Sequence, residues 1–260
     1  LIMKFSANLG LLWSELPLLD RIYKAKEMGF DAIEFQFPYE VDANELKKAI
    51  DIINLPIIGI NTIKGNVSIG DNGLNAVPSK IKEAREAIDQ AIEYAKVIGA
   101  KNIHCMGGIT EQNNDSLTTF VENLKYAARK LKDSNIGLVI EPKNQKDFPG
   151  YFLTKVEQAK EICELVGNND VKIMFDFYHV QINQGNVLTR FRDNFNFIGH
   201  VQMASVPDRN EPIFGELNYS NILSEIYKFG YQGYIGAEYN PLKNTDEGLS
   251  WMKSFNKEDK

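Results

Sequence analysis

Residues 137–142 read GLVIEP, an apolar run that ends in the carboxylate of Glu141 and a proline. Three later runs repeat the pattern, each with one polar side chain at or near its end: VKIMFDF at 171–177 with Asp176, IGHVQMA at 198–204 with Gln202, and YIGAEYN at 234–240 with Glu238. The four polar positions are separated by roughly the 30 residues that one strand-plus-helix unit occupies. We therefore expect a parallel barrel that brings all four side chains to one mouth.

Outward from these runs, stretches with the period of a strand alternate with stretches that have the period of a helix. Four earlier strands are expected at MKFSAN (3–8), AIEFQF (32–37), PIIGIN (56–61) and NIHCMG (102–107). Helices are expected at 16–28, 78–98, 116–131, 155–166 and 220–229, several of them followed by a glycine that ends the helix. Eight strands alternating with helices predict a closed (β/α)8 barrel, a TIM barrel, rather than an open sheet.

The chain of 260 residues has the length of one large α/β domain, and no linker or low-complexity tract divides it. We expect a single TIM-barrel domain over 1–260, with the polar stretch 253–260 as a frayed tail. The sequence leaves open whether Leu1 and Ile2, which precede Met3, are native. Two long connections, 61–77 and 205–218, leave the barrel at its mouth and are candidates for covering a substrate.

The balance of charge and hydrophobicity excludes some classes of partner. The formal net charge is −6 and the pI is about 5.3, which argues against general affinity for nucleic acid or for an anionic membrane. No run approaches about 20 apolar residues, and the N-terminus lacks the pattern of a signal peptide. We expect a cytoplasmic protein whose Cys105 and Cys163 are reduced thiols. Whether it forms a homo-oligomer stays open.

The four polar strand ends together predict a metal site. Carboxylates and amides are hard oxygen donors, so Glu141, Asp176, Gln202 and Glu238 would suit one divalent cation, Mg²⁺ or Mn²⁺. Singly, each has an ordinary alternative: Asp176 is also a good N-cap for a following helix, and the Gln202 amide could simply satisfy backbone groups. Their common position on four successive strands is what favours the metal site.

Three further polar residues are candidates for binding a substrate. His179 could cap a cluster of ligands, bind a substrate oxygen, or pack as a structural histidine. His104 is expected to point into the barrel, with pocket-lining and structural roles equally open. Arg209, in the long seventh loop, is the best cation for an anionic substrate, because a guanidinium group can bind a carboxylate with two hydrogen bonds.

Other polar residues and motifs carry less weight. For His200 we favour a structural role, and for Glu34 a buried ion pair is at least as good an interpretation as a place in the pocket. The sequence contains no GxGxxG, Walker P-loop, GxSxG or HExxH motif. Hydride transfer and ATP chemistry therefore receive no support.

The predicted set of groups suits proton transfer next to a carbonyl. A divalent cation that binds both oxygens of an α-hydroxycarbonyl compound acidifies the C–H between them and stabilises the resulting enediolate. Glu141 and Glu238 would enter from different sides, so that one removes a proton and the other delivers it. This supports aldose–ketose isomerisation or epimerisation of a small anionic hydroxy-carbonyl substrate. The same groups could position a water for metal-assisted hydrolysis.

The chain also resembles the hydroxypyruvate isomerase family, within the xylose-isomerase-like barrel superfamily. The resemblance runs almost end to end and includes KFSANL, GFDAIEFQFPY, VENLKYAA, LVIEPKN, PGYFLT, DFYHVQ, IGHVQMASVPDRNEP, GELNY and GYIGAEYNP. It implies interconversion of hydroxypyruvate and tartronate semialdehyde through an enediolate. By position, it implies that Glu141 and Glu238 are the acid/base pair and also metal ligands, that Asp176 and Gln202 complete the metal shell, and that His179 and Arg209 bind or polarise the substrate.

Details of the resemblance bear on the choice within the superfamily. Related ketose 3-epimerases usually have a histidine at the position of Gln202. In the seventh loop, Ser205 and Val206 stand where an acidic residue is common, and Ile213 and Phe214 replace a Gly-Thr pair. The resemblance therefore implies the type of reaction more firmly than the substrate.

Three other functions compete with this one. The first is an isomerase or 3-epimerase of a longer ketose or of a four-carbon oxo-sugar acid. The second is a nuclease of the apurinic-endonuclease type, which needs a histidine-rich zinc cluster and is disfavoured by only three histidines and an acidic net charge. The third is a non-catalytic sugar- or metal-binding barrel, which the intact pair Glu141 and Glu238 disfavours.

Overall fold

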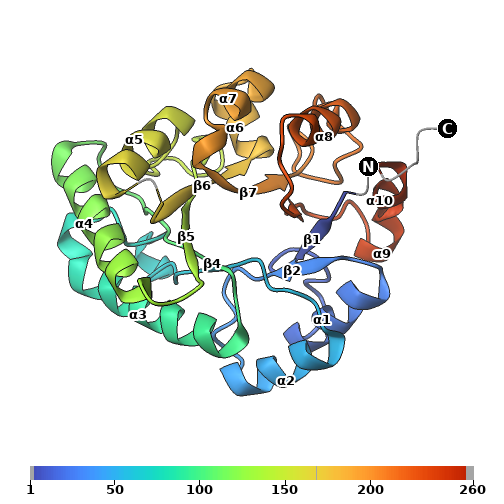
Figure 1. Ribbon diagram of the computed structural model, residues 1–260, viewed down its shortest axis with the longest axis horizontal. Coiled ribbons are helices and arrows are strands. Elements are labelled where there is room, and N and C mark those ends of the chain that lie inside the picture. The colour runs from blue at the N-terminus through green and yellow to red at the C-terminus, as the bar shows by residue number, and fades with distance from the viewer. Residues whose placement is uncertain (1–2, 168, 256–260) are drawn as a thin grey trace.

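The computed structural model describes residues 3–167 and 169–255. Within them, parallel strands surrounded by helices form a barrel (Figure 1). The strands are hydrogen-bonded in the order β2-β1-β8-β7-β6-β5-β4-β3. Their bounds are β1 Phe5–Asn8, β2 Ala32–Glu34, β3 Ile60–Asn61, β4 Asn102–His104, β5 Gly137–Ile140, β6 Val171–Asp176, β7 Ile198–Met203 and β8 Ile235–Ala237. Each lies inside a run that the sequence predicted to be a strand, which confirms the TIM-barrel fold.

Strands β2 and β3 close the barrel through the residues that lead into β3. Ile33 forms an isolated parallel bridge with Ile57, and the Ile58 amide donates to the Ile33 carbonyl at 2.8 Å. Further along, the Phe35 amide donates to the Gly59 carbonyl at 3.0 Å. The extended segment before β3 therefore completes the ring, as the predicted strand at 56–61 requires.

Helices cover the outside of the barrel and carry its connections. The helices that the sequence predicted are present, with others that it did not delimit: α1 Leu18–Glu27, α2 Ala43–Ile53, α3 Ile81–Ile98, α4 Asn114–Leu131, α5 Val156–Val166, α6 Phe177–Asn183, α7 Val187–Asp193, α8 Tyr219–Lys228, α9 Thr245–Gly248 and α10 Ser250–Phe255. Short 3-10 helices lie at Val67–Ile69, Pro78–Lys80 and Phe195–Phe197. Gly99 follows α3 with φ of 75°, a left-handed conformation that glycine adopts without a steric penalty.

The frayed tail expected at 253–260 lies mostly outside the described residues. Lys253 to Phe255 form the end of helix α10, and 256–260 are not described, nor are 1–2. The anchor of α10 is Trp251, which is fully buried and meets the ring of Phe5 edge-on at 4.9 Å. Its indole nitrogen donates to the hydroxyl of Tyr239 at 3.1 Å. The aromatic contact with β1 fixes α10 to the barrel. The polar composition of the C-terminal stretch gives no sign of this contact.

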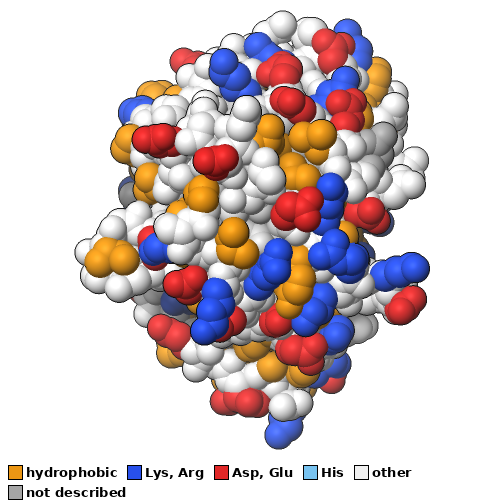
Figure 2. Space-filling model, turned by 90° about the vertical axis from the view of Figure 1, so that its left-hand side faces the viewer, with side chains coloured by type: hydrophobic (Ala, Val, Ile, Leu, Met, Phe, Trp, Pro, Cys, Tyr) orange, Lys and Arg blue, Asp and Glu red, His pale blue; other side chains and the backbone are white. Residues whose placement is uncertain are grey.

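The side of the molecule that carries α4 presents acidic and basic side chains close together (Figure 2). Some of them pair between neighbouring helices, as Lys130 does with Asp89 at 3.0 Å, while Lys125 and Glu122 pair within α4 at 3.3 Å. Such exposed pairs contribute little to stability, typically about 0–1 kcal/mol each. No helix among the described residues is long and apolar enough to span a membrane.

Candidate active site

The predicted residues gather at the carboxyl ends of the strands. Glu141 follows β5 directly, Asp176 ends β6, Gln202 is the last residue but one of β7, and Glu238 follows β8. Asp176 and Gln202 are direct partners in the register of β6 and β7. All four side chains are buried. The barrel therefore places them at the mouth that the strand spacing predicted.

Glu141 lies between a lysine and a histidine. Its Oε2 is 3.2 Å from Nζ of Lys143 and 3.8 Å from Nδ1 of His104. Burial raises the pKa of Glu141, although the positive charge of Lys143 opposes this effect. Burial alone would lower the pKa of Lys143, but the Glu141 carboxylate raises it above the ordinary lysine value. Lys143 therefore stays charged inside the site.

His104 is buried and faces the barrel interior. Its Nδ1 lies 3.2 Å from Oδ1 of Asn61, and burial lowers its pKa well below the ordinary histidine value. The imidazole is therefore neutral. The expectation that His104 points inward agrees with this position.

The two carboxylate oxygens of Asp176 lie in different environments. Its Oδ1 accepts a hydrogen bond from the Tyr178 amide at 2.9 Å, which makes Asp176 the N-cap of α6. Its Oδ2 lies 3.6 Å from Nε2 of His179 and 3.9 Å from Nη2 of Arg209. Burial raises the pKa of Asp176 well above its ordinary value. The helix cap that the sequence offered as an alternative is therefore real, and it leaves the second oxygen facing the site.

Glu238 is held by hydrogen bonds from three sides. Its Oε1 accepts from the side-chain amides of Asn8 at 3.1 Å and Gln36 at 2.8 Å, and its Oε2 accepts from Nη2 of Arg209 at 2.9 Å. Arg209 has a φ of 57°, a left-handed conformation that costs a non-glycine residue on the order of 1–3 kcal/mol. The seventh loop therefore directs this guanidinium group into the mouth at an energetic cost.

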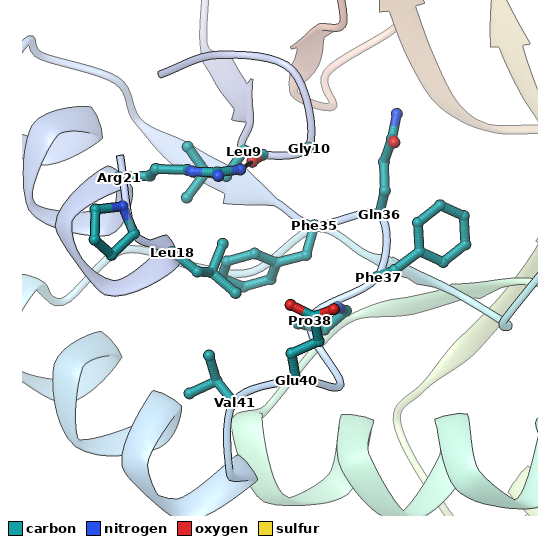
Figure 3. A pocket seen from close by; sticks show the side chains of 11 residues that line it. Leu9, Gly10, Leu18, Arg21, Phe35, Gln36, Phe37, Pro38, Glu40 and Val41 are labelled. Carbon is teal, nitrogen blue, oxygen red and sulfur yellow. Dashed lines mark hydrogen bonds between the residues drawn. The ribbon is translucent and has the colours of Figure 1, made fainter. Parts of the chain in front are cut away.

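A cavity of about 450 Å³ adjoins the mouth next to Gln36. It lies between Leu9 and Gly10 after β1, the start of α1, and the segment after β2 that ends at Val41. Figure 3 shows the Gln36 side chain directed away from most of the residues that line this cavity. Gln36 lines the cavity, and its side chain donates to Glu238 on the other side. Gln36 therefore lies between the cavity and the candidate active site.

A buried polar pair lies deeper in the barrel. His200 Nε2 is 2.7 Å from Oε2 of Glu34, and both residues are buried. The amide nitrogen of Gln202 reaches the other oxygen of Glu34 at 3.5 Å. The structural role favoured for His200 agrees with this geometry, and Glu34 is hydrogen-bonded to His200 inside the barrel. The contact also turns the carbonyl oxygen of Gln202 away from Glu34.

Several buried atoms at this mouth lack a hydrogen-bond partner among the described residues, namely Glu141 Oε1, Asp176 Oδ2, Gln202 Oε1 and the Nε2 atoms of His104 and His179. Buried polar atoms in native proteins almost always have a partner, so each of these requires one from outside the chain. Three of them are oxygens on residues that the sequence assigned to a metal. Hard oxygen donors suit Mg²⁺ or Mn²⁺, so the residues present fit a divalent cation.

The structure also differs from the simplest picture of four ligands. Ligand atoms of Glu141, Asp176 and His179 lie within 4.8 Å of one another, so a residue assigned to substrate lies in a cluster of potential metal ligands. Both oxygens of Glu238 already accept hydrogen bonds. To bind a cation through Oε2, Glu238 would therefore have to use an oxygen that also accepts a hydrogen bond from Arg209.

Sequence reasoning missed Lys143, Asn8, Gln36 and Asn144. Lys143 lies two residues after Glu141, and side chains at i and i+2 of an extended segment share a face. Asn8 ends a buried strand in the same way as the predicted ligands, and Gln36 follows β2. The same signal of a polar residue at a strand end would have found Asn8 and Gln36.

The mouth of this barrel combines two glutamates that could exchange a proton with buried cations that could hold an anion. Curated relatives are similar to this chain over nearly its whole length: the chain is 40% identical over 255 residues to the 2-oxo-tetronate isomerase of Cupriavidus necator, covering 97% of this chain and 98% of that protein. It is 38% identical over 260 residues to the hydroxypyruvate isomerase of Escherichia coli, covering 98% and 100%. The protein is thus an isomerase of the aldose–ketose type.

The chain belongs to the family described as Xylose isomerase-like TIM barrel, whose family model matches residues 22–255. Among solved structures, it superimposes with a TM-score of 0.94 on one from Brucella melitensis described as AP endonuclease, family 2. That protein is 36% identical to this one, and the match covers 98% of this chain and 100% of the other.

Proposed function

We propose that this protein interconverts hydroxypyruvate and tartronate semialdehyde, using one divalent cation, Mg²⁺ or Mn²⁺, held by Glu141, Asp176, Gln202 and Glu238. The observation that carries the proposal is the group of buried, unpaired oxygens at the mouth, contributed by three of these four residues. When bound, the cation would polarise the carbonyl of the substrate and stabilise the negative charge of the enediolate. The remaining chemistry is assigned to side chains.

The charges of the site favour a substrate with one negative charge. Metal ligation requires the three carboxylates to be ionised, and the buried cations Lys143 and Arg209 balance two of them. One negative charge remains, so a divalent cation leaves one positive charge in excess. The carboxylate of a small oxo acid would neutralise it, whereas a neutral ketose would leave it uncompensated in a buried site.

Glu141 and Glu238 are assigned the proton transfers. Burial raises the pKa of Glu141, which makes its carboxylate a better proton acceptor near neutral pH. One glutamate removes the proton from C3 of hydroxypyruvate and later returns it to solvent, the hydroxyl proton on O3 moves to O2, and the other glutamate relays a proton from solvent to C2. Asn8, Gln36 and Arg209 hold the Glu238 carboxylate at a fixed position for its part in this exchange.

A four-carbon oxo acid is the second candidate substrate, since relatives at 40%, 39% and 37% identity are 2-oxo-tetronate isomerases. The chemistry is the same exchange between C2 and C3, with a hydroxymethyl group added at C3. The nuclease description of the Brucella structure is less well supported by this site. His200 is bonded to Glu34, which leaves His104 and His179 as the histidines near the carboxylates.

The test is a substrate panel assayed with Mg²⁺ or Mn²⁺. It contains hydroxypyruvate, a four-carbon 2-oxo acid and several neutral ketoses, each followed by kcat/KM. The proposal predicts the largest kcat/KM for hydroxypyruvate and entry of solvent deuterium into it at C3. Preference for the four-carbon acid would favour the second candidate. Turnover of neutral ketoses alone, or no deuterium exchange with any oxo acid, would contradict the proposal.

A further inference from the structure

Asn144 contacts Nδ1 of the His179 imidazole through both its backbone and its side chain. The Asn144 backbone amide lies 3.2 Å from Nδ1 of His179, and the side-chain Nδ2 of Asn144 lies 2.8 Å from the same nitrogen. His179 and Asn144 are both fully or almost fully buried. A backbone N–H can only donate a hydrogen bond, so Nδ1 must be the acceptor in at least one of these contacts.

Asp147 fixes which end of the Asn144 amide faces His179. The Asp147 backbone amide donates to Oδ1 of Asn144 at 2.8 Å, while Oδ2 of Asp147 accepts from Nδ2 of Asn144 at 3.1 Å. The hydroxyl of Tyr178 donates to the same Asp147 oxygen at 2.6 Å. With its oxygen engaged by an N–H donor, Asn144 turns its NH₂ group toward His179. Both contacts to Nδ1 therefore come from donors.

Two donors at Nδ1 decide the tautomer of a neutral imidazole. Nδ1 must carry the lone pair, so the proton lies on Nε2. That atom faces the site, 3.5 Å from Oε1 of Glu141 and 3.6 Å from Oδ2 of Asp176, and it has no hydrogen-bond partner in the described part of the chain. His179 thus presents a proton donor to the same space as the unpaired carboxylate oxygens.

We infer that Asn144, oriented by Asp147, is a positioning residue that fixes His179 in the tautomer with the proton on Nε2. A histidine that binds a metal through Nε2 normally donates its Nδ1–H to an acceptor, and here Nδ1 meets only donors. His179 therefore stays out of the metal shell although its Nε2 lies close to Glu141 and Asp176. It donates from Nε2 to a substrate oxygen, a role that rests on the proposed function.

The tautomer can be measured without turnover. Long-range proton–nitrogen NMR correlations on protein labelled with ¹⁵N-histidine distinguish a protonated ring nitrogen from an unprotonated one, and the chain has only three histidines to assign. In metal-free enzyme at neutral pH, we expect His179 to carry its proton on Nε2, and we expect this to persist when Mg²⁺ is added. A proton on Nδ1, or its transfer there on adding Mg²⁺, would overturn the inference.

Two variants test the positioning residues themselves. Asn144→Asp replaces the side-chain donor at 2.8 Å with a carboxylate acceptor, which should outweigh the longer contact of 3.2 Å from the backbone amide. The His179 spectrum should therefore change to a protonated Nδ1, and kcat should fall about 10- to 100-fold. The Kd for Mn²⁺ should change much less than kcat, because His179 is not a metal ligand in this account. Asp147→Leu, which releases the Asn144 amide, should shift the spectrum in the same direction if the first variant fails to fold.

A matched control makes the same chemical change elsewhere. Asn113→Asp alters the exposed N-cap of α4 and should leave both the His179 spectrum and kcat unchanged. An unaltered His179 tautomer in both folded test variants would remove the role assigned to Asn144. If no oxo acid is turned over but the tautomer shifts as expected, the proposed function fails while the positioning inference stands.

Discussion

The ammonium group of Lys143 lies 3.2 Å from Oε2 of Glu141, with both side chains almost completely buried. Lys143 also lies over the ring of Phe148, with 4.7 Å between Nζ and the ring centroid. A buried charge of this kind is costly unless it is paired. Its place beside the proposed base makes it, together with Arg209, a cation that could receive the carboxylate of a small oxo acid.

Replacing Lys143 by methionine should weaken substrate binding more than turnover. Hydrogen bonds to charged groups contribute about 1.5–3 kcal/mol, so we expect KM for hydroxypyruvate to rise by at least about 10-fold. The exposed Lys146, three residues further on, is the matched control, and Lys146→Met should leave KM unchanged. Steady-state kinetics with both variants would contradict the assignment if Lys143→Met kept the KM of the wild type.

Glu141→Gln and Glu238→Gln should each abolish measurable turnover while keeping the fold. Removing a general acid or base typically costs about 100- to 10,000-fold in rate. Circular dichroism should match the wild type, since glutamine preserves the size of the side chain. The exposed Glu122→Gln on α4 is the control. Near wild-type kcat in either test variant would refute the proton-transfer roles.

Removing the cation should stop the reaction, and binding it should release protons. Burial raises the pKa of both Glu141 and Asp176, so the cation-free protein keeps protons on them to higher pH than ordinary carboxylates do. A cation must displace these protons, so its affinity should rise as the pH increases through and above the range in which ordinary carboxylates ionise. Calorimetry in buffers of different ionisation enthalpy measures the release; an affinity independent of pH would argue against these ligands.

Trp251→Ala should lower the free energy of unfolding by about 3–5 kcal/mol, the usual cost of truncating a buried tryptophan. The residue is fully buried and contacts Phe5 on β1, so the loss would leave a cavity beneath the barrel's first strand. Lys253→Ala, on an exposed position of α10, should change stability by less than about 0.5 kcal/mol. Chemical denaturation of both variants provides the comparison, and equal stabilities would place α10 outside the core.

The sequence predicted the barrel because each strand is a compact apolar run, and the register then brings Asp176 and Gln202 side by side without further information. It could not predict the anchoring of α10, because the contact of Trp251 with Phe5 joins opposite ends of the chain. Nor could it predict that Arg209 reaches Glu238, since this depends on the left-handed backbone at Arg209. The tautomer of His179 depends on the Asn144 side chain, whose orientation only the folded loop reveals.

The central claim is that Glu141, Asp176, Gln202 and Glu238 share one divalent cation. A crystal grown with Mn²⁺ and measured for anomalous scattering tests this most directly. The account predicts a single peak at the barrel mouth, with an oxygen of each of the four residues within about 2.6 Å and Nε2 of His179 uncoordinated. A peak elsewhere, or one coordinated by His179 in place of Gln202, would contradict it.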